Sequence, residues 1–340
     1  MLRKAILGFV ASVGVLAAVE VGLRLFLPLD TLLFSWERPT GMISRNEAGG
    51  MVTRPGMAEE RDDGPYRWAT SLNDLGLRED DEVPAKKPPG TYRILAIGDS
   101  WMYGFSVSQG HTIPDVLEDI LPAKLGQPVE VINAGVFGSC AFDMLARYRQ
   151  FVDAYEIDGV LLGQPHNAGR LQRVEAERSA WYRAYRDGPA STARLYLLTR
   201  RALAPLRSGT YAAPPKGTGQ QAEIADLRLL ALDAKARGLP VWFAEFPDQM
   251  DHGLRGFSGS PAWRKGLADA GVRFGGHALG ERACWAFVDA GHPGESGAYV
   301  IADALSDVIA TGASLDTIRI TPRCADVAAA GPGKPGWPLP

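Results

Sequence analysis

Short β-type runs that alternate with helical patterns constrain the fold of this chain most. Four such runs each end in turn residues: "YRILAIGDS", "VEVINAGVFG", "DGVLLGQP" and "VWFAEFPD". Helical patterns separate them, as in "TIPDVLEDILPAKLG", where Thr112 is typical of an N-cap and Gly126 of a C-terminal stop. Strands that alternate with helices pair in parallel and are covered on both faces. We therefore predict an α/β protein with a parallel sheet.

The length of 340 residues allows one hydrophobic core of α/β size and is short for two full domains. We expect one domain over residues 91–310, with an insertion at 169–207 that supplies no strand and should lie over the sheet. Residues 36–90 read as a spacer and lead-in, because the stretch "DDEVPAKKPPGTYR" is rich in charges and prolines. The Ala-, Gly- and Pro-rich residues 311–340 are expected to form a flexible tail.

The first 35 residues contain an export or anchoring segment. Arg3 and Lys4 precede an uncharged stretch that runs from Ala5 to Val19, and the sequence stays mostly apolar to Leu29. The full stretch is long enough to span a membrane, whereas the uncharged part alone suits a signal peptide. We favour an uncleaved signal-anchor over cleavage near position 17 or 18. Basic residues ahead of the segment place the rest of the chain outside the cytoplasm, periplasmic in a bacterium.

Charge is unevenly distributed along the chain. The net charge of −3 gives no global basic field, so nucleic acid is not expected as a partner. Between Arg170 and Arg207, nine arginines stand against three acidic residues. We interpret this stretch as a solvated helical surface, with contact to anionic glycans or lipid head groups as the alternative.

Polar residues follow the predicted strands at the edge where a parallel sheet carries its functional loops. Ser100 follows the first run, Gly138 the second and Asn167 the third. The stretch "FVDAGHPGESG" places Asp289 and His292 three residues apart, just before a helical pattern. The sequence therefore predicts that these five residues form one site.

The residue types in this site suit nucleophilic catalysis. A serine hydroxyl becomes a nucleophile when a base takes its proton, and a neutral imidazole can do so. We expect Ser100 as nucleophile, His292 as base and Asp289 as the carboxylate that orients the imidazole. The backbone N–H groups of Ser100 and Gly138 and the amide of Asn167 would stabilise the oxyanion.

Four motifs, "ILAIGDSWMYG", "VINAGVFG", "GQPHN" and "DAGHPGESG", together resemble the four blocks of the SGNH, or GDSL, hydrolase superfamily. The stretch "SLNDLGLRED" resembles a lead-in found in its membrane-anchored bacterial members. The resemblance implies a flavodoxin-like three-layer α/β/α sandwich, the roles given above for Ser100, Gly138, Asn167, Asp289 and His292, and hydrolysis or transfer of an acyl ester. The third block departs from the usual Gly-x-Asn-Asp pattern, because Gln164, Pro165 and His166 separate Gly163 from Asn167.

These observations predict an extracytoplasmic, membrane-anchored serine esterase that acts on an acyl ester of a cell-envelope glycan or lipid. An O-acyltransferase using the same acyl-Ser100 intermediate and a non-catalytic envelope-binding protein on a hydrolase scaffold are the alternatives. No cofactor motif is present, and the spacings of Cys140, Cys284 and Cys324 do not suit a metal. Pairing of Cys284 with Cys324 is left open.

Several residues near the motifs allow two interpretations. Trp101 and Tyr103 either form a platform for substrate or pack a helix onto the sheet, which is the commoner use of such aromatics. Asn73 and Arg78 in the lead-in either brace the loops of the site or cap a turn. The histidines at 111, 252 and 277 have no partner at metal-ligand spacing, and Asp248, Asp251 and His252 either line the cleft or belong to a solvated loop.

Overall fold

A computed structural model describes residues 2–28, 32, 42–45, 50–62, 67–167, 192–199, 202, 218–246, 260–279 and 292–320. Its centre is a six-stranded parallel sheet in the order β10-β9-β8-β7-β5-β6. The strands are β5 (Tyr92–Ile97), β6 (Val129–Asn133), β7 (Gly159–Gly163), β8 (Val241–Ala244), β9 (Arg273–Leu279) and β10 (Leu315–Ile320). The first five follow the flavodoxin-like order 2-1-3-4-5, so the predicted fold class is confirmed.

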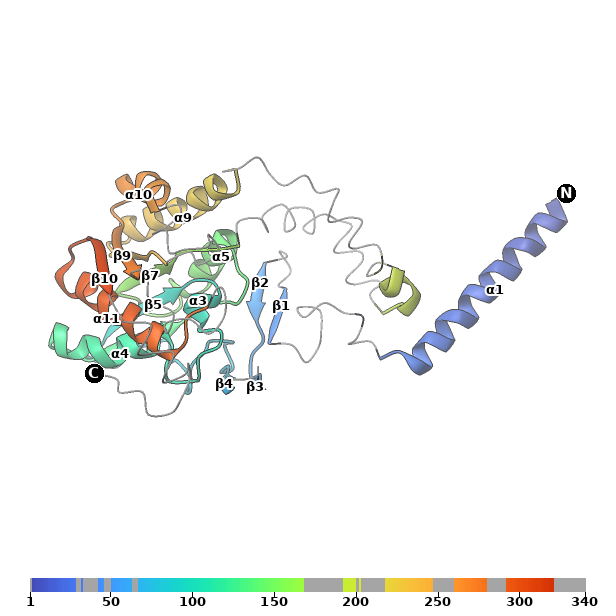
Figure 1. Ribbon diagram of the computed structural model, residues 1–340, viewed down its shortest axis with the longest axis horizontal. Helices are drawn as coiled ribbons and strands as arrows, with labels where there is room; N and C mark the ends of the chain where they lie inside the picture. Colours follow the sequence, from blue (N-terminus) through green and yellow to red (C-terminus); the bar gives the residue numbers. More distant parts are fainter. Residues whose placement is uncertain are drawn as a thin grey trace.

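Helices cover both faces of the sheet and make three layers (Figure 1). The α5, α9 and α10 side buries Leu95, Ile97 and Val160. The opposite face packs α3, α4 and α11 on Ile94, Ala96 and Leu161. The helices are α3 (Ser100–Tyr103), α4 (Ile113–Leu125), α5 (Ala141–Phe151), α9 (Thr218–Ala236), α10 (Ser260–Leu267) with the 3₁₀ turn η4 (Ala268–Ala270), and α11 (Glu295–Thr311). Alternate residues of each central strand thus point to opposite helical layers, as period-2 geometry requires.

The ends of α4 are those that the sequence predicts. Thr112 Oγ1 accepts a hydrogen bond from the N–H of Asp115, whose carboxylate accepts from the N–H of Thr112 in return. This capping box satisfies two N–H groups that a helix start leaves without partners. Gly126 ends the helix with a φ of 69°, in the left-handed region where glycine is favoured.

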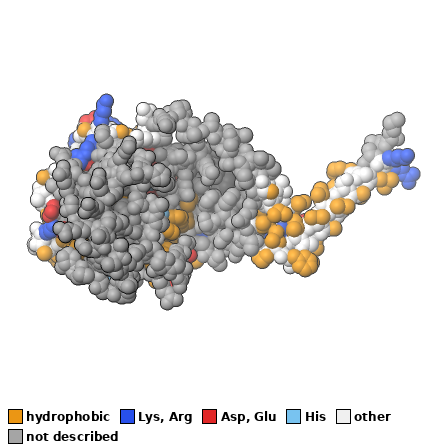
Figure 2. All heavy atoms as spheres, in the orientation of Figure 1, with side chains coloured by type: hydrophobic (Ala, Val, Ile, Leu, Met, Phe, Trp, Pro, Cys, Tyr) orange, Lys and Arg blue, Asp and Glu red, His pale blue; other side chains and the backbone are white. Residues whose placement is uncertain are grey.

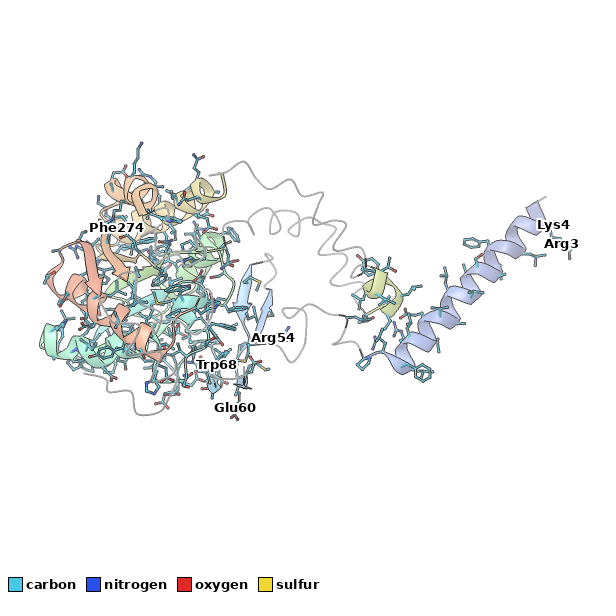
Figure 3. All side chains as sticks on the ribbon, viewed as in Figure 1. Arg3, Lys4, Arg54, Glu60, Trp68 and Phe274 are labelled. Carbon is cyan, nitrogen blue, oxygen red and sulfur yellow. The ribbon has the colours of Figure 1, made fainter. Side chains whose placement is uncertain are left out.

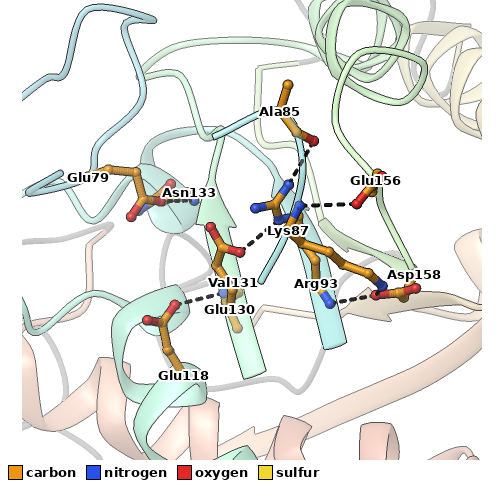
Figure 4. A network of polar contacts seen from close by, with 10 residues as sticks. All are labelled: Glu79, Ala85, Lys87, Arg93, Glu118, Glu130, Val131, Asn133, Glu156 and Asp158. Carbon is orange, nitrogen blue, oxygen red and sulfur yellow. Dashed lines mark hydrogen bonds and ion pairs between the residues drawn. The ribbon is translucent and has the colours of Figure 1, made fainter. Parts of the chain in front are cut away.

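Polar contacts tie the chain just before β5 to the amino ends of the strands (Figure 4). Arg93 Nε donates to Glu130 over 2.7 Å, and the N–H of Arg93 donates to Asp158 over 2.8 Å. Lys87 pairs with the same Asp158 carboxylate, and Ala85 O accepts from the Arg93 guanidinium. These contacts attach the end of the lead-in to three adjacent strands.

The region expected as a spacer contains regular structure. It forms two antiparallel pairs, β1 (Ile43–Arg45) with β2 (Met51–Thr53) and β3 (Ala58–Asp62) with β4 (Arg67–Ser71). Buried Met42 and Leu72 pack with Ile43 and Met57 in one apolar cluster at these short strands. The part rich in charges and prolines, residues 80–90, carries no strand, as its composition predicts.

Helix α1 (Leu2–Phe26) contains one apolar stretch that is long enough to cross a membrane. The stretch Ile6–Phe26 has a mean hydropathy of 2.2 and is not buried against the rest of the chain. Figure 2 shows hydrophobic side chains along this helix and basic side chains at its N-terminal end. A signal sequence has the same length and composition, so this finding alone fits either an anchor or a signal sequence.

The structure departs from the expected organisation in two places. Residues 192–199 of the insertion lie against α1 rather than over the sheet (Figure 1), where Glu20 accepts from the N–H groups of Arg194 and Leu195 over 2.9 and 2.8 Å. Leu315–Ile320 belong to the edge strand β10 and not to a flexible tail. An edge strand needs only one neighbour, and β9 supplies it.

Candidate active site

The structure brings Ser100 and His292 into contact at the carboxyl edge of the sheet. His292 Nε2 lies 3.0 Å from Ser100 Oγ, although the residues are 192 positions apart. Ser100 begins α3 directly after β5, and His292 lies three residues before α11. Ser100 is 7% exposed, so the hydroxyl is largely shielded from bulk water. This separation lets the imidazole take the serine proton.

A tight strand-to-helix turn presents Ser100. Asp99 caps α3, since its Oδ1 accepts from the N–H of Trp101 over 3.1 Å. Gly98 must be small, because a Cβ there would lie 2.5 Å from the Cβ of Met102. The helix ends after one turn at Gly104, which has a φ of 80°. Close packing of the turn therefore fixes the direction of the Ser100 side chain.

The loop after β6 lies against the same turn. Gly98 O accepts from the N–H of Val136 and from Ser139 Oγ, both over 3.0 Å. A Cβ on Gly135 would collide with the backbone of Tyr103. Gly138 has a φ of 76°, a conformation that favours glycine. The predicted oxyanion donor Gly138 thus belongs to a loop that is packed directly against the start of α3.

Asn167 and His166 both contact Asp99. Asn167 Nδ2 lies 3.3 Å from Asp99 Oδ2 and donates to Ser139 O over 3.0 Å. The N–H of His166 donates to the same Asp99 oxygen over 2.8 Å, and His166 Nδ1 lies 3.1 Å from it. Each hydrogen of the Asn167 amide therefore has an acceptor within the protein. To serve an oxyanion, one of these hydrogen bonds has to give way to the substrate.

The structure decides between the two interpretations of Trp101, Tyr103 and Asn73, whereas several other candidate residues lie outside the described part of the chain. Trp101 and Tyr103 are 3% and 2% exposed, so both pack in the interior and form no open platform. Asn73 caps a turn, with its Oδ1 accepting from the N–H groups of Leu75 and Leu77. The residues outside the described ranges are Asp248, Asp251, His252, Cys284, Asp289 and Cys324.

Arg78 braces the segment that follows Ser100. Its guanidinium donates to Tyr103 O over 2.7 Å and also to the carbonyls of Gly104 and Val107. The side chain is buried, and desolvation lowers its pKa below the usual arginine value. Of the two roles that the sequence allows for Arg78, bracing and turn-capping, these contacts support bracing.

Glu223 is a buried carboxyl group that no sequence motif marks. It lies on α9 and accepts from the N–H of Ala141, the first residue of α5, over 2.9 Å. Burial raises its pKa to about 8, with the negative charges of Asp99 and Asp143 adding to the effect. Burial likewise raises the pKa of the Cys140 thiol, so this free cysteine is an inert part of the core. Within the described ranges no cluster of three His, Cys, Asp or Glu side chains is arranged to hold a metal ion.

Comparison with solved structures finds esterases and members of the G-D-S-L and SGNH hydrolases. The psychrotrophic esterase EstA from Pseudoalteromonas sp. is 17% identical with a TM-score of 0.41, and the match covers 65% of this chain and 97% of that one. A member of the lipolytic G-D-S-L family from Veillonella parvula is 14% identical with a TM-score of 0.38, over 64% and 97%. AlinE4, an SGNH-hydrolase family esterase, is 17% identical with a TM-score of 0.37, over 66% and 98%. No protein-family model and no curated protein matches the chain.

Proposed function

We propose that this chain is a serine esterase of the SGNH type that hydrolyses an acyl ester through an acyl-Ser100 intermediate. The observation that carries the proposal is the 3.0 Å contact between His292 Nε2 and Ser100 Oγ. The resemblance of the four sequence motifs to that superfamily supports the same chemistry.

The reaction has two halves. In the first, His292 Nε2 takes the Ser100 proton while Oγ attacks the ester carbonyl, and the imidazolium then gives the proton to the departing alcohol. In the second, water attacks the acyl-serine by the same route and releases the acid. We assign the oxyanion to the N–H groups of Ser100 and Gly138 and to the Asn167 amide, and the orienting carboxylate to Asp289.

The chain is further proposed to be held in the membrane by α1, with the remainder on the outer side. Arg3 and Lys4 precede the apolar stretch, and such basic residues favour the cytoplasmic side. A reporter enzyme fused after the last residue should be active only outside the cytoplasmic membrane, and the protein should resist carbonate extraction. A soluble full-length protein in the cytoplasm would contradict this proposal.

Labelling with a fluorophosphonate tests the nucleophile, because this probe needs an activated serine and no particular substrate. We expect the full-length protein in detergent to be labelled and Ser100→Ala not to be. Cys140→Ser is a suitable control, since it changes a buried residue outside the proposed chemistry. Equal labelling of wild type and Ser100→Ala would remove the assignment.

Two alternatives use the same scaffold. An O-acyltransferase would pass the acyl group from Ser100 to a sugar hydroxyl, so added glycan would receive the acyl group faster than water does. A non-catalytic envelope-binding protein would neither be labelled nor hydrolyse short acyl esters.

A further inference from the structure

An aromatic side chain flanks the imidazole of the Ser100–His292 pair. The Phe105 ring lies 4.7 Å from the His292 ring, centroid to centroid, at an interplanar angle of 50°. The N–H of Phe105 donates to Ser100 O over 2.9 Å, so the segment that carries the ring is fixed to the nucleophile itself. Phe105 therefore places an apolar ring beside the proposed base.

Phe137 extends this surface toward the predicted oxyanion donor. Its ring stacks on Phe105 with 4.7 Å between centroids and 22° between planes, and it directly precedes Gly138. Both phenylalanines are partly exposed. We call Phe105 and Phe137 the apolar wall. The wall thus runs from His292 to the residue next to Gly138.

The lead-in before the sheet supports the wall from behind. Trp68 of β4, labelled in Figure 3, meets Phe105 edge-on with 5.2 Å between centroids. The two wall residues belong to a cluster whose other described members are Met42, Ile43, Met57, Leu72 and Tyr103. Tyr103 is buried, so this cluster offers a substrate apolar rather than hydrogen-bonding groups.

The direction of the reaction decides which part of an ester meets the wall. His292 Nε2 must deliver its proton to the oxygen of the leaving alcohol. The rest of the alcohol group is attached to that oxygen and therefore lies next to the side chain that flanks the imidazole. The ring that flanks the imidazole is that of Phe105. We propose that the site selects esters whose alcohol part is apolar, an alkyl or aryl group, and that the wall binds this part. The inference rests on the proposed function and specifies its substrate class.

A polyol or sugar alcohol fits this surface poorly. Its hydroxyl groups would lose hydrogen bonds to water at the wall and find none in the apolar cluster, which costs free energy. A lipid-like alcohol instead gains from burial of its hydrocarbon surface against two phenylalanine rings. The geometry therefore favours a lipid-like ester over an ester of a bare glycan.

A matched series of acetate esters tests the inference with full-length protein in detergent. The acyl group stays constant while the alcohol varies from glycerol to n-hexanol and 2-phenylethanol. We expect kcat/KM to be roughly 10- to 100-fold higher for the apolar alcohols, the scale on which hydrophobic pockets discriminate. Phe137→Ala should lower this preference about tenfold, and Phe137→Leu should lower it less. Leu229→Ala, at an exposed position on α9, should leave it unchanged.

Fluorophosphonate labelling separates the two ways in which this experiment can fail. Absence of both labelling and hydrolysis in the wild type would overturn the proposed function and the wall with it. A labelled wild type with no preference for apolar alcohols would overturn the wall alone. The same holds if Phe137→Ala is labelled and keeps the wild-type preference. If Phe137→Ala is not labelled, Phe137→Leu decides by the same criterion.

Discussion

Replacement of Arg78 by methionine should destabilise the segment that follows the proposed nucleophile. The guanidinium donates to three carbonyls between Tyr103, the last residue of α3, and Val107. Methionine fills a similar volume but donates no hydrogen bond, so the three carbonyls stay buried without this donor. The substitution thus removes the polar contacts and leaves most of the packing.

The expected cost follows from the number of these contacts. Loss of a partner for a buried polar group costs about 1–3 kcal/mol. Burial already penalises the charged guanidinium, as its lowered pKa shows, so the lower end of that range applies. Three contacts at about 1 kcal/mol each give roughly 3 kcal/mol. In a domain of 150–250 residues this corresponds to a fall in Tm of about 6–12 °C.

Thermal unfolding and fluorophosphonate labelling measure the two consequences. We expect Arg78→Met to lower Tm by the amount given above and to slow labelling of Ser100 at temperatures where the protein is still folded. Arg78→Lys should have a Tm and a labelling rate between those of the wild type and Arg78→Met, because one ammonium group cannot donate in the same geometry as a guanidinium. Arg237→Met is the control, since Arg237 pairs with Asp153 and Asp233 at the surface, where ion pairs contribute little. Wild-type labelling and Tm in Arg78→Met would refute the reasoning.

Three further predictions concern other parts of the molecule. Burial raises the pKa of Glu223 to about 8 from an ordinary value of 4.5, so between these pH values the folded state holds a proton that the unfolded state releases, and stability falls as pH rises. The fall in Tm from about pH 5 to about pH 8 should therefore be smaller in Glu223→Gln than in the wild type. An equal fall in both proteins would contradict this prediction. If Asn167 serves the oxyanion, Asn167→Ala should lower kcat roughly 100- to 1000-fold with little change in KM, whereas His166→Ala should be much milder; the reverse pattern would make His166 the donor. The N–H groups of Arg194 and Leu195 donate to the Glu20 carboxylate, so Glu20→Ala should speed hydrogen exchange at these two groups. Unchanged exchange would show that residues 194–199 keep their structure without this contact.

The sheet could be predicted from sequence because its central strands carry a local signal. The runs at Ile94 and Val131 are bounded by turn residues, and the helix starting after Thr112 carries its own cap. These features depend on neighbouring residues only. The flavodoxin-like strand order, by contrast, is what the resemblance of the four motifs to the SGNH superfamily implies.

The lead-in, the insertion and the last strand could not be predicted in the same way, because long-range contacts determine them. Arg78 reaches carbonyls 25 to 29 positions away, and Glu20 contacts residues 174 and 175 positions away. Strand β10 follows the Gly312 stop of α11 and, among the described strands, pairs only with β9, which lies more than 30 positions earlier in the chain. A local sequence pattern does not reveal such distant partners. Composition alone therefore predicts a spacer over residues 36–90 and a tail over residues 311–340.

The third motif has more residues between Gly163 and Asn167 than the pattern it resembles, and the structure shows what these residues contact. The extra residues between Gly163 and Asn167 bring the backbone and ring of His166 to the Asp99 carboxylate, where the Asn167 amide also binds. Asp99 is fully buried and caps the helix that begins with Ser100, so the third loop is coupled to the nucleophile through one carboxylate. The His166 ring stacks on Trp101 with 5.3 Å between centroids, which holds the loop from its other side. His166 thus anchors the longer third loop to Asp99, and this carboxylate holds the Asn167 amide beside the helix that begins with Ser100.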